Sequence, residues 1–406
     1  MKLLDPNCRI EDFLQKTLDP PVFDTIRNAI LVLQDIGALS HDEKLTELGE
    51  KLGSLPVHPV TSKMLIFAIL MNCLEPALTL ACASDYKDPF TLPMLPSERK
   101  KAAAAKAELA SLYGGHSDQL AVVAAFDCWK NAKRRGQEAR FCSKYHISPS
   151  TMSILFGMRR QLEMELVQNG FIPEDISTCS LNARDPGILH AVLVAGLYPM
   201  VGRLLPPQKK GKRAVVETGS GGRVLLHRQS LNFELSHKLT DYCPLIVYDE
   251  ITRGDGGTHI RNCTVVGPLP LLMVAKEIAV APAKENDNGK GDIVNDTDGN
   301  DEAGVVETVE DKMDIENKPN EQPEEMIMSS PDNSVTVVVD RWLYFWSKAL
   351  DIAQLYCLRE RLSAAILFKV SGYRLLFLVS RSCLILLVHS CLPFLHDCND
   401  FLLCFR

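Results

Sequence analysis

Apolar residues recur at helical spacing in the first part of the chain. Residues 20–36 repeat them every three or four positions up to Gly37, and the resulting stripe consists of Val22, Ile26, Ile30 and Leu33. Asp19 is the expected N-cap, and Pro20 suits a first helical turn. The pattern therefore predicts an amphipathic helix with both ends marked in the sequence.

Two more helical patterns follow. Thr46 is the expected N-cap of the second, whose apolar face consists of Leu48, Leu52 and Leu55. Pro56 ends that helix, and Thr61 and Ser62 are expected to open a third, more apolar helix. Three consecutive helices of this kind predict a compact helical domain.

Helical periodicity continues as far as residue 184. A proline-rich segment at residues 85–98 interrupts it, after which Ser97 and Ser117 are the expected N-caps of two helices. A longer helix is expected over residues 150–167, with an apolar stripe made of Ile154, Met158, Leu162 and Leu166. This part of the chain is therefore predicted to be all-helical.

The period changes after one more predicted helix at residues 185–197. Stretches of strand-like length follow, separated by glycine, proline and basic turns: PMVGRLL, RAVVET, GRVLLH, PLIVYDEITR and THIRNCTVVG. Short strands with glycine-rich turns are typical of a small barrel or a sandwich. Strand-like sequence returns at residues 335–346, and a helix is predicted over residues 348–370.

An acidic segment lies between these strand-like stretches. Residues 281–334 hold 16 Asp and Glu against 4 Lys and Arg, a local charge of -12 within a total of -7, so the remaining chain carries +5. The segment has too little apolar surface to order itself, and we expect a disordered loop inserted within the barrel. It either competes with a nucleic acid for basic residues or only lengthens a loop. The basic excess elsewhere suits a nucleic-acid partner.

Cysteine usage indicates a reducing compartment. The 13 cysteines are scattered, form no CxxC pair and partly lie in apolar helical patterns. The first residues lack the apolar core and cleavage site of a secretory signal, so we expect the chain to be internal to a larger product. The expected location is intracellular: nucleus or cytoplasm, with an organelle also open.

The last residues, 371–406, are apolar and cysteine-rich without periodicity. Their longest apolar run is far shorter than the roughly 18 residues that span a bilayer. We interpret this divergent tail as the result of altered splicing or a shifted reading frame. A membrane-associating tail is the alternative, and no membrane partner is expected.

Several phrases resemble the C-terminal portion of DEAH/RHA-type ATP-dependent RNA helicases, of the plant-like DExH-box kind. They are LTELGEKLGSLPVHP at residues 45–59, FCSKYHISPSTM at 141–152 and HAVLVAGLYPMVGR at 190–203, followed by LIVYDEI and IRNCTVVGPLPLLM. The resemblance implies an α+β multidomain chain that lacks the RecA-like ATPase lobes. Its expected parts are a winged-helix-like segment (1–60), an all-α ratchet or HA2-like domain (61–184), an OB-fold β-barrel domain (185–370) with the insert 281–334, and the tail.

The resemblance also implies a function. In this family such modules enclose single-stranded RNA during 3′-to-5′ translocation and unwinding, while RecA-like lobes, in cis or in trans, use ATP and Mg²⁺. We expect this chain alone to hold no cofactor and to hydrolyse no ATP. Two alternatives remain: a non-enzymatic RNA-binding or adaptor protein that acts through the OB-fold, and a purely structural module. Structured RNA and DNA also remain open as ligands.

Phosphate-binding and catalytic motifs are missing from the sequence. GxxxxGK[ST] does not occur, and neither does the GxSxG of a hydrolase or a zinc-ligand spacing. The stretch IVYDEIT at residues 246–252 is similar to a Walker B strand, but Thr252 stands where DEAH enzymes have histidine. Asp249 and Glu250 are therefore expected at a strand edge of the barrel, and no catalytic or metal site is predicted.

Two candidate surfaces for RNA follow from the resemblance. OB-folds bind single strands through a basic groove with stacking aromatic rings. The basic candidates are Lys209, Lys210, Lys212, Arg213, Arg223, Arg228, Lys238, Arg253 and Arg261, and the aromatic ones are Tyr198, Phe233, Tyr242 and Tyr248. The second surface, on the ratchet-like part, consists of Lys133, Arg134, Arg135, Arg159 and Arg160. In both cases the alternative is that these side chains are merely solvated.

Overall fold

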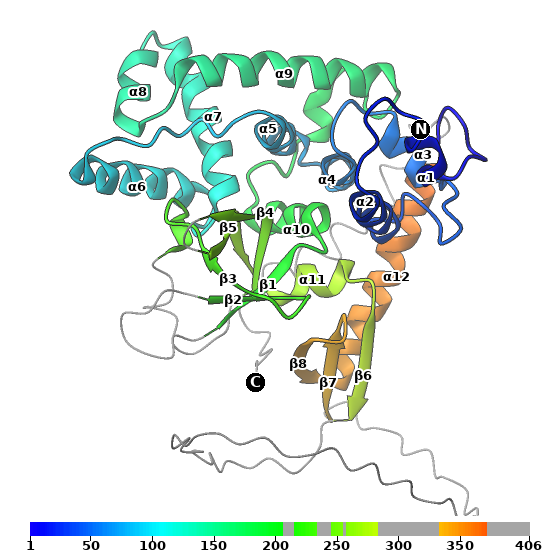
Figure 1. Cartoon of the computed structure of the whole chain (residues 1–406). Coiled ribbons are helices and arrows are strands. Elements are labelled where there is room, and N and C mark those ends of the chain that lie inside the picture. The colour runs from blue at the N-terminus through cyan, green and yellow to red at the C-terminus, as the bar shows by residue number, and fades with distance from the viewer. Residues whose placement is uncertain (206–214, 234–244, 255–256, 283–332, 372–406) are drawn as a thin grey trace, which may run out of the picture.

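The computed structural model describes residues 1–205, 215–233, 245–254, 257–282 and 333–371 (Figure 1). Most helices form one layer, and a closed β-barrel lies beneath it, with α10 (Pro186–Leu197) against the barrel. A second sheet lies farther from the helices. From this sheet α12 (Ala349–Ser371) runs back to the N-terminal helices.

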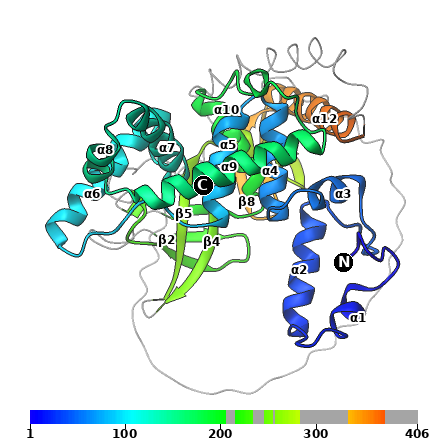
Figure 2. The same ribbon diagram turned by 90° about the horizontal axis from the view of Figure 1, so that it is seen from above.

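Three short helices open the chain. They are α1 (Ile10–Leu14), α2 (Phe23–Asp35) and α3 (Glu47–Gly53), and Figure 2 shows them to one side of the helical layer. The predicted cap of α3 is confirmed, because the Thr46 side chain accepts a hydrogen bond from the Gly49 N–H. Leu52 and Leu55 share one core with the following helices, so packing is continuous from the first predicted domain into the second.

The predicted start of α2 is wrong. Its N-cap is Val22, which makes no side-chain capping bond, and Asp19 lies outside the helix. The reason is the Pro20-Pro21 pair, because a residue before proline is disfavoured in the helical region. The helix therefore begins only after the second proline.

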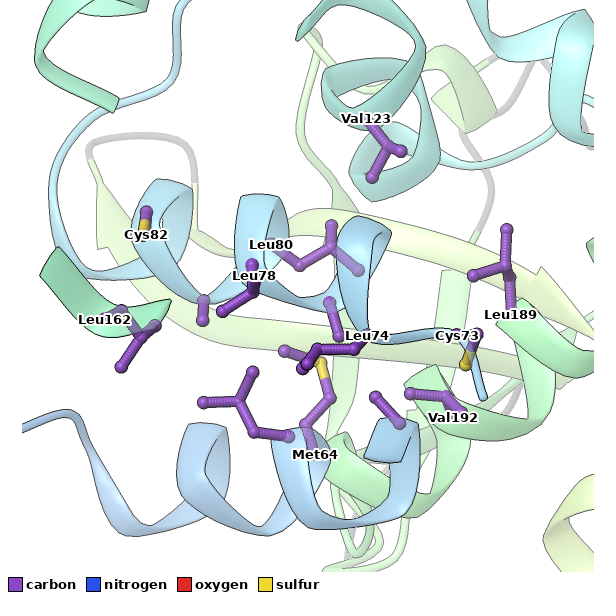
Figure 3. Packing of buried hydrophobic residues seen from close by; sticks show 14 of the residues in the cluster. Met64, Cys73, Leu74, Leu78, Leu80, Cys82, Val123, Leu162, Leu189 and Val192 are labelled. Carbon is purple, nitrogen blue, oxygen red and sulfur yellow. The ribbon is translucent and has the colours of Figure 1, made fainter. Parts of the chain in front are cut away.

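Six α-helices and one 3₁₀ turn build the central bundle. They are α4 (Pro59–Leu70), α5 (Leu74–Asp85), α6 (Pro96–Ala110), η1 (Ser111–Tyr113), α7 (Asp118–Arg134), α8 (Glu138–Tyr145) and α9 (Pro149–Gln168). Helices α4 and α5 are apolar on nearly all sides and are buried. Figure 3 shows Met64 of α4, Leu74 of α5 and Val192 of α10 meeting in this core.

Two bundle helices begin at a proline, earlier in the chain than predicted. Helix α4 begins at Pro59, with His58 as its cap, so Thr61 and Ser62 are buried inside the helix instead of opening it. Helix α6 likewise begins at Pro96, and no side chain caps it. Proline at the first helical position needs no N–H partner, so in both cases the helix starts earlier than predicted. The predicted Ser117 cap of α7 is confirmed.

The barrel follows α10, whose predicted start is confirmed by hydrogen bonds from the Gly187 and Ile188 N–H groups to Asp185. Its strands are β1 (Val201–Leu205), β2 (Val215–Thr218), β3 (Arg223–Leu226), β4 (Leu245–Gly254) and β5 (Gly257–Val266). They close in the order β1-β2-β3-β5-β4, and only the β3–β5 pairing is parallel. The predicted small barrel is therefore confirmed.

The expected barrel strand at residues 335–346 belongs to a different sheet. After α11 (Pro268–Val274), the strands β6 (Ile278–Pro282), β7 (Ser334–Val339) and β8 (Leu343–Lys348) form an antiparallel three-stranded sheet. The five strands before residue 267 already close the barrel, so they leave no edge for β7 to join. Instead β7 and β8 pack on α11 and α12 through residues such as Val337 and Phe345.

Some sequence predictions lie outside the described residues. They concern Lys209, Lys210, Lys212, Arg213, Lys238, Tyr242, almost all of the acidic segment 281–334, and residues 372–406. Within the described part of the chain, no helix combines the length and apolar character needed to cross a bilayer.

Candidate nucleic-acid interface

One side of the barrel carries a cluster of basic groups. Val224, Leu226 and Ile260 point into the barrel core, so alternation turns their neighbours on β3 and β5 outward. The parallel register places Leu225 opposite His259, which brings the outward residues of both strands together. We call this cluster the basic barrel face, and it consists of Arg223, His227, His259 and Arg261.

The two histidines lie in contact on this face. The ring centroids of His227 and His259 are 6.1 Å apart and the rings are nearly perpendicular. Burial lowers the pKa of His227, and the positive charges of Arg261 and His259 lower it further. Sequence reasoning missed both histidines. The signal was present in the alternation of THIR, which puts His259 and Arg261 on one face of a strand.

The other described arginines of the barrel are placed differently. Arg228 is exposed in the turn directly after His227. Arg253 is exposed near the tip of the β4–β5 hairpin, opposite Thr258. Alternation along β4 points Arg253 away from the side that carries Glu250 and Arg261. The structure therefore places Arg223 and Arg261 on one face, puts Arg228 next to His227 in the chain and leaves Arg253 apart.

The predicted stacking tyrosines are buried. Tyr198 is 5% exposed, and its hydroxyl donates to the Asp340 carboxylate at 2.9 Å and accepts from the Lys276 N–H. Tyr248 is part of the barrel core. In this structure neither ring offers a free face to a base, whereas Phe233 is only half-buried.

The second candidate surface is the C-terminal end of α7. Its exposed members are Lys133, Arg134 and Arg135, which we call the basic helix end. Cations at this position interact favourably with the negative end of the helix dipole. The Lys133 Nζ lies 4.7 Å from the centroid of the Trp129 ring, which gives its ammonium group a preferred position.

Arg159 is separated from this surface by burial. It is 6% exposed, and its guanidinium donates to the backbone oxygen of Glu75 at 3.1 Å and also pairs with the Glu75 carboxylate. It also lies over the Phe126 ring, 4.6 Å from the centroid. Arg160, the next residue, is exposed. Arg159 therefore joins α9 to α5 and α7, and only Arg160 faces solvent.

Comparisons with known proteins agree with this order of modules. Residues 29–57 match the winged-helix part of the helicase associated domain (HA2), residues 58–144 its ratchet-like part, and residues 189–278 an oligonucleotide/oligosaccharide-binding (OB)-fold. Two Arabidopsis thaliana proteins, the DExH-box ATP-dependent RNA helicases DExH6 and DExH2, are 60% and 56% identical over 92% and 91% of this chain. The chain belongs to the C-terminal, helicase-associated region of the DExH/DEAH-box RNA helicase family.

The chain is short compared with these relatives. It spans 29% of DExH6 and 23% of DExH2. The human ATP-dependent DNA/RNA helicase DHX36 is 35% identical over 68% of this chain, which covers 27% of its length. The chain therefore spans less than a third of each of these relatives.

Asp249 and Glu250, the acidic pair of the stretch IVYDEIT, lie in the barrel. Asp249 is in β4 and accepts a hydrogen bond from the Gln119 Nε2 at 3.3 Å, while Glu250 is the cross-strand partner of Arg261. Burial raises the pKa of Asp249 to about 6. The relatives are named as ATP-dependent. The described residues of this chain contain no group of three metal-ligating side chains, and its sequence has no GxxxxGK[ST] motif.

Proposed function

We propose that this chain holds single-stranded RNA for a DExH-box motor, through the basic barrel face and the basic helix end. The observation that supports it most is the grouping of Arg223, Arg261 and two histidines on the outer side of a barrel of the OB type. Guanidinium groups pair with phosphate oxygens and fix the position of a strand without reading its sequence.

The motor in this proposal is a pair of RecA-like lobes, in cis or in trans. The relatives are named as ATP-dependent helicases, and this chain spans less than a third of DExH6. ATP and Mg²⁺ then bind to the lobes. The role of this chain is to keep the strand bound while the lobes step along it from 3′ to 5′.

The expected binding is mainly electrostatic. Tyr198 and Tyr248 are buried, so the described residues offer few rings for base stacking, and phosphate contacts must supply most of the affinity. Such binding depends little on sequence and falls steeply with salt.

The test is fluorescence anisotropy with a labelled single-stranded RNA of about 20 nucleotides, measured over a series of salt concentrations. The variant R223Q/R228Q/R261Q should weaken binding and reduce the slope of log K against log salt by about 0.7 per lost contact, thus by up to about 2. The control is Arg341→Gln, because Arg341 is 83% exposed, pairs with Glu277 and lies between β7 and β8, outside the strands of the barrel. This control should leave both quantities unchanged.

A second variant, K209Q/K210Q/K212Q/R213Q, tests the lysine-rich stretch outside the described residues. It should also weaken binding to RNA. The proposal fails if the unmodified chain shows no salt-dependent binding, or if the triple arginine variant binds as tightly as the Arg341→Gln control. Single-stranded DNA of equal length, bound equally well, would widen the ligand class to both nucleic acids.

ATP hydrolysis gives an independent check. Because this chain lacks a phosphate-binding loop, the purified chain should release no phosphate from ATP, with or without RNA. Hydrolysis that copurifies with the chain through successive columns would contradict the assignment of ATP to separate lobes.

A further inference from the structure

The turn that precedes α7 is docked onto the barrel. Ser117 forms an isolated β-bridge with Thr264 of β5, and their hydroxyl oxygens lie 2.6 Å apart. The Val265 N–H donates to the His116 carbonyl at 3.0 Å, so the turn continues the hydrogen bonding of β5. The Asn232 amide also donates to this carbonyl at 3.0 Å. We call this contact the α7–β5 junction, and it consists of residues 116–119, 230–232 and 262–265.

Asp118 is the centre of the junction. Its carboxylate is 2% exposed and accepts four hydrogen bonds of 3.2 Å or less from three segments. The donors are Lys106 Nζ at 2.9 Å, Leu231 N at 3.0 Å, Ser230 Oγ at 2.6 Å and Cys263 N at 3.2 Å. One carboxylate thus joins α6, the turn after β3, and β5.

Burial makes the Asp118 carboxylate dependent on these partners. A carboxylate removed from water is strongly unfavourable unless hydrogen bonds and an opposite charge replace its hydration. Asp118 finds all of these partners only when the barrel is seated on α6 and α7 in the observed position. A tilt or a slide of the barrel would separate the carboxylate from donors in two segments at once.

The junction lies between the two candidate RNA surfaces. Cys263 is two residues from Arg261, and Ser230 is two residues from Arg228, so the barrel side of the junction is continuous with the basic barrel face. Asp118 is the first residue of α7, a helix of 17 residues that leads to the basic helix end. At 1.5 Å per residue this helix is about 25 Å long.

We propose that Asp118 is a positioning residue that fixes the basic barrel face at a set distance and direction from the basic helix end, so that one nucleic-acid strand contacts both. This inference rests on the proposed function. Two sites at a fixed separation bind a long strand more tightly than either site alone. This gain in affinity is lost when the separation of the two sites is no longer fixed.

The experiment compares two labelled single-stranded RNAs in the full chain. One has about 8 nucleotides, within the site size of a single OB-fold, and the other has about 25. In Asp118→Asn the affinity for the long RNA should fall at least about tenfold, while that for the short RNA stays within about twofold. Amide hydrogen exchange should rise at residues 262–265, which a loss of binding groups alone would not cause.

The matched control is Asp127→Asn, the same change on the same helix. Asp127 accepts from the Tyr113 hydroxyl at 3.1 Å, and the charged groups that act on it, Lys130, Arg159 and Glu75, also belong to the bundle. It should preserve the difference between long and short RNA. Gly196→Ala, a change in the α4–α10 contact, is the second control and shows whether reduced stability alone alters that difference.

Three outcomes decide the matter. A folded Asp118→Asn protein with unchanged affinity for the long RNA overturns the inference. If the unmodified chain binds neither RNA, the proposed function itself fails, which is a separate result. If Asp118→Asn does not fold, Ser230→Ala replaces it, because this change removes one donor and leaves the Lys106 pair intact. A smaller loss confined to long RNA then supports the inference, and no loss overturns it.

Discussion

Gly196 of α10 lies directly against Met64 of α4. A Cβ atom at position 196 would be 2.5 Å from the Met64 Cβ, closer than real Cβ atoms approach another atom, and 3.2 Å from its Cα, which is also tight. Because the clash involves the start of the side chain and the backbone, a change of rotamer cannot relieve it. Gly196→Ala should therefore lower the free energy of unfolding by about 1–3 kcal/mol, measured by urea denaturation.

At Gly157 of α9, a change to alanine is expected to have the opposite effect on stability. Nothing lies within 4 Å of a Cβ atom added at this position. Gly157→Ala should raise the free energy of unfolding by about 0.5–1 kcal/mol, since alanine loses less conformational freedom in a helix. Equal effects of the two substitutions would contradict the close α4–α10 contact.

Arg159 and Arg160 should respond in different ways. Arg159→Met leaves the Glu75 carboxylate without its main partner. The cost should be about 2–3 kcal/mol, below the usual range for buried pairs because Glu75 is 34% exposed. Arg160→Met should change stability by less than about 0.5 kcal/mol, as is usual at an exposed position. Thermal unfolding of the two variants checks this, and the same melting temperature for both would count against a buried Arg159.

Asp249 should make the barrel less stable at neutral pH than in mild acid. The pKa of Asp249 is raised from 3.8 to about 6 by burial, so the folded protein keeps a proton that the unfolded chain releases between these values. Stability due to this group therefore falls as pH rises from about 4 to about 6. Asp249→Asn should add about 1–2 kcal/mol at pH 7, discounted for partial exposure.

The control for this prediction is the pH dependence itself. The difference in stability between Asp249→Asn and the unmodified chain should be largest above pH 6 and vanish below pH 4. Denaturant unfolding at several pH values measures it. A difference that stays constant with pH would mean that the substitution acts through packing and not through the charge.

Thr46 and Asp19 test where the first helices begin. The Thr46 side chain accepts from the Gly49 N–H, so Thr46→Ala should cost about 1 kcal/mol. Asp19 caps nothing, and Asp19→Ala should leave stability unchanged within about 0.5 kcal/mol. Chemical denaturation distinguishes the two. A cost at position 19 as large as that at position 46 would restore the original placement of the α2 cap.

Local signals in the sequence predicted some helix starts and missed others. Thr46 and Ser117 were expected as caps, and each accepts a backbone hydrogen bond from the first turn, because capping depends only on residues three or fewer positions away. Asp19 and Ser97 were also expected as caps and are not, since prolines set the starts of those two helices. The period change after residue 197 likewise predicted the strands, since alternation reports burial on one face.

Features that depend on distant segments were not predictable in this way. The local sequence around Arg159 and Arg160 does not indicate that Arg159 contacts Glu75, which lies 84 residues earlier. It also does not indicate that Arg160 is exposed to solvent. The contact of His227 with His259 likewise requires the parallel β3–β5 register, which no local pattern encodes. The second sheet was missed because strand periodicity does not say which sheet a strand joins.

The pairing of β6 with β7 has a consequence for how this protein tolerates change. Pro282 and Val335 are direct cross-strand partners, so these two residues are held about 5 Å apart by the pairing of β6 with β7. Each doubling of such a connection adds only about 0.6 kcal/mol of closure entropy. The connection between Pro282 and Val335 should therefore accept a tag, a reporter or a regulatory sequence while β6 and β7 stay paired.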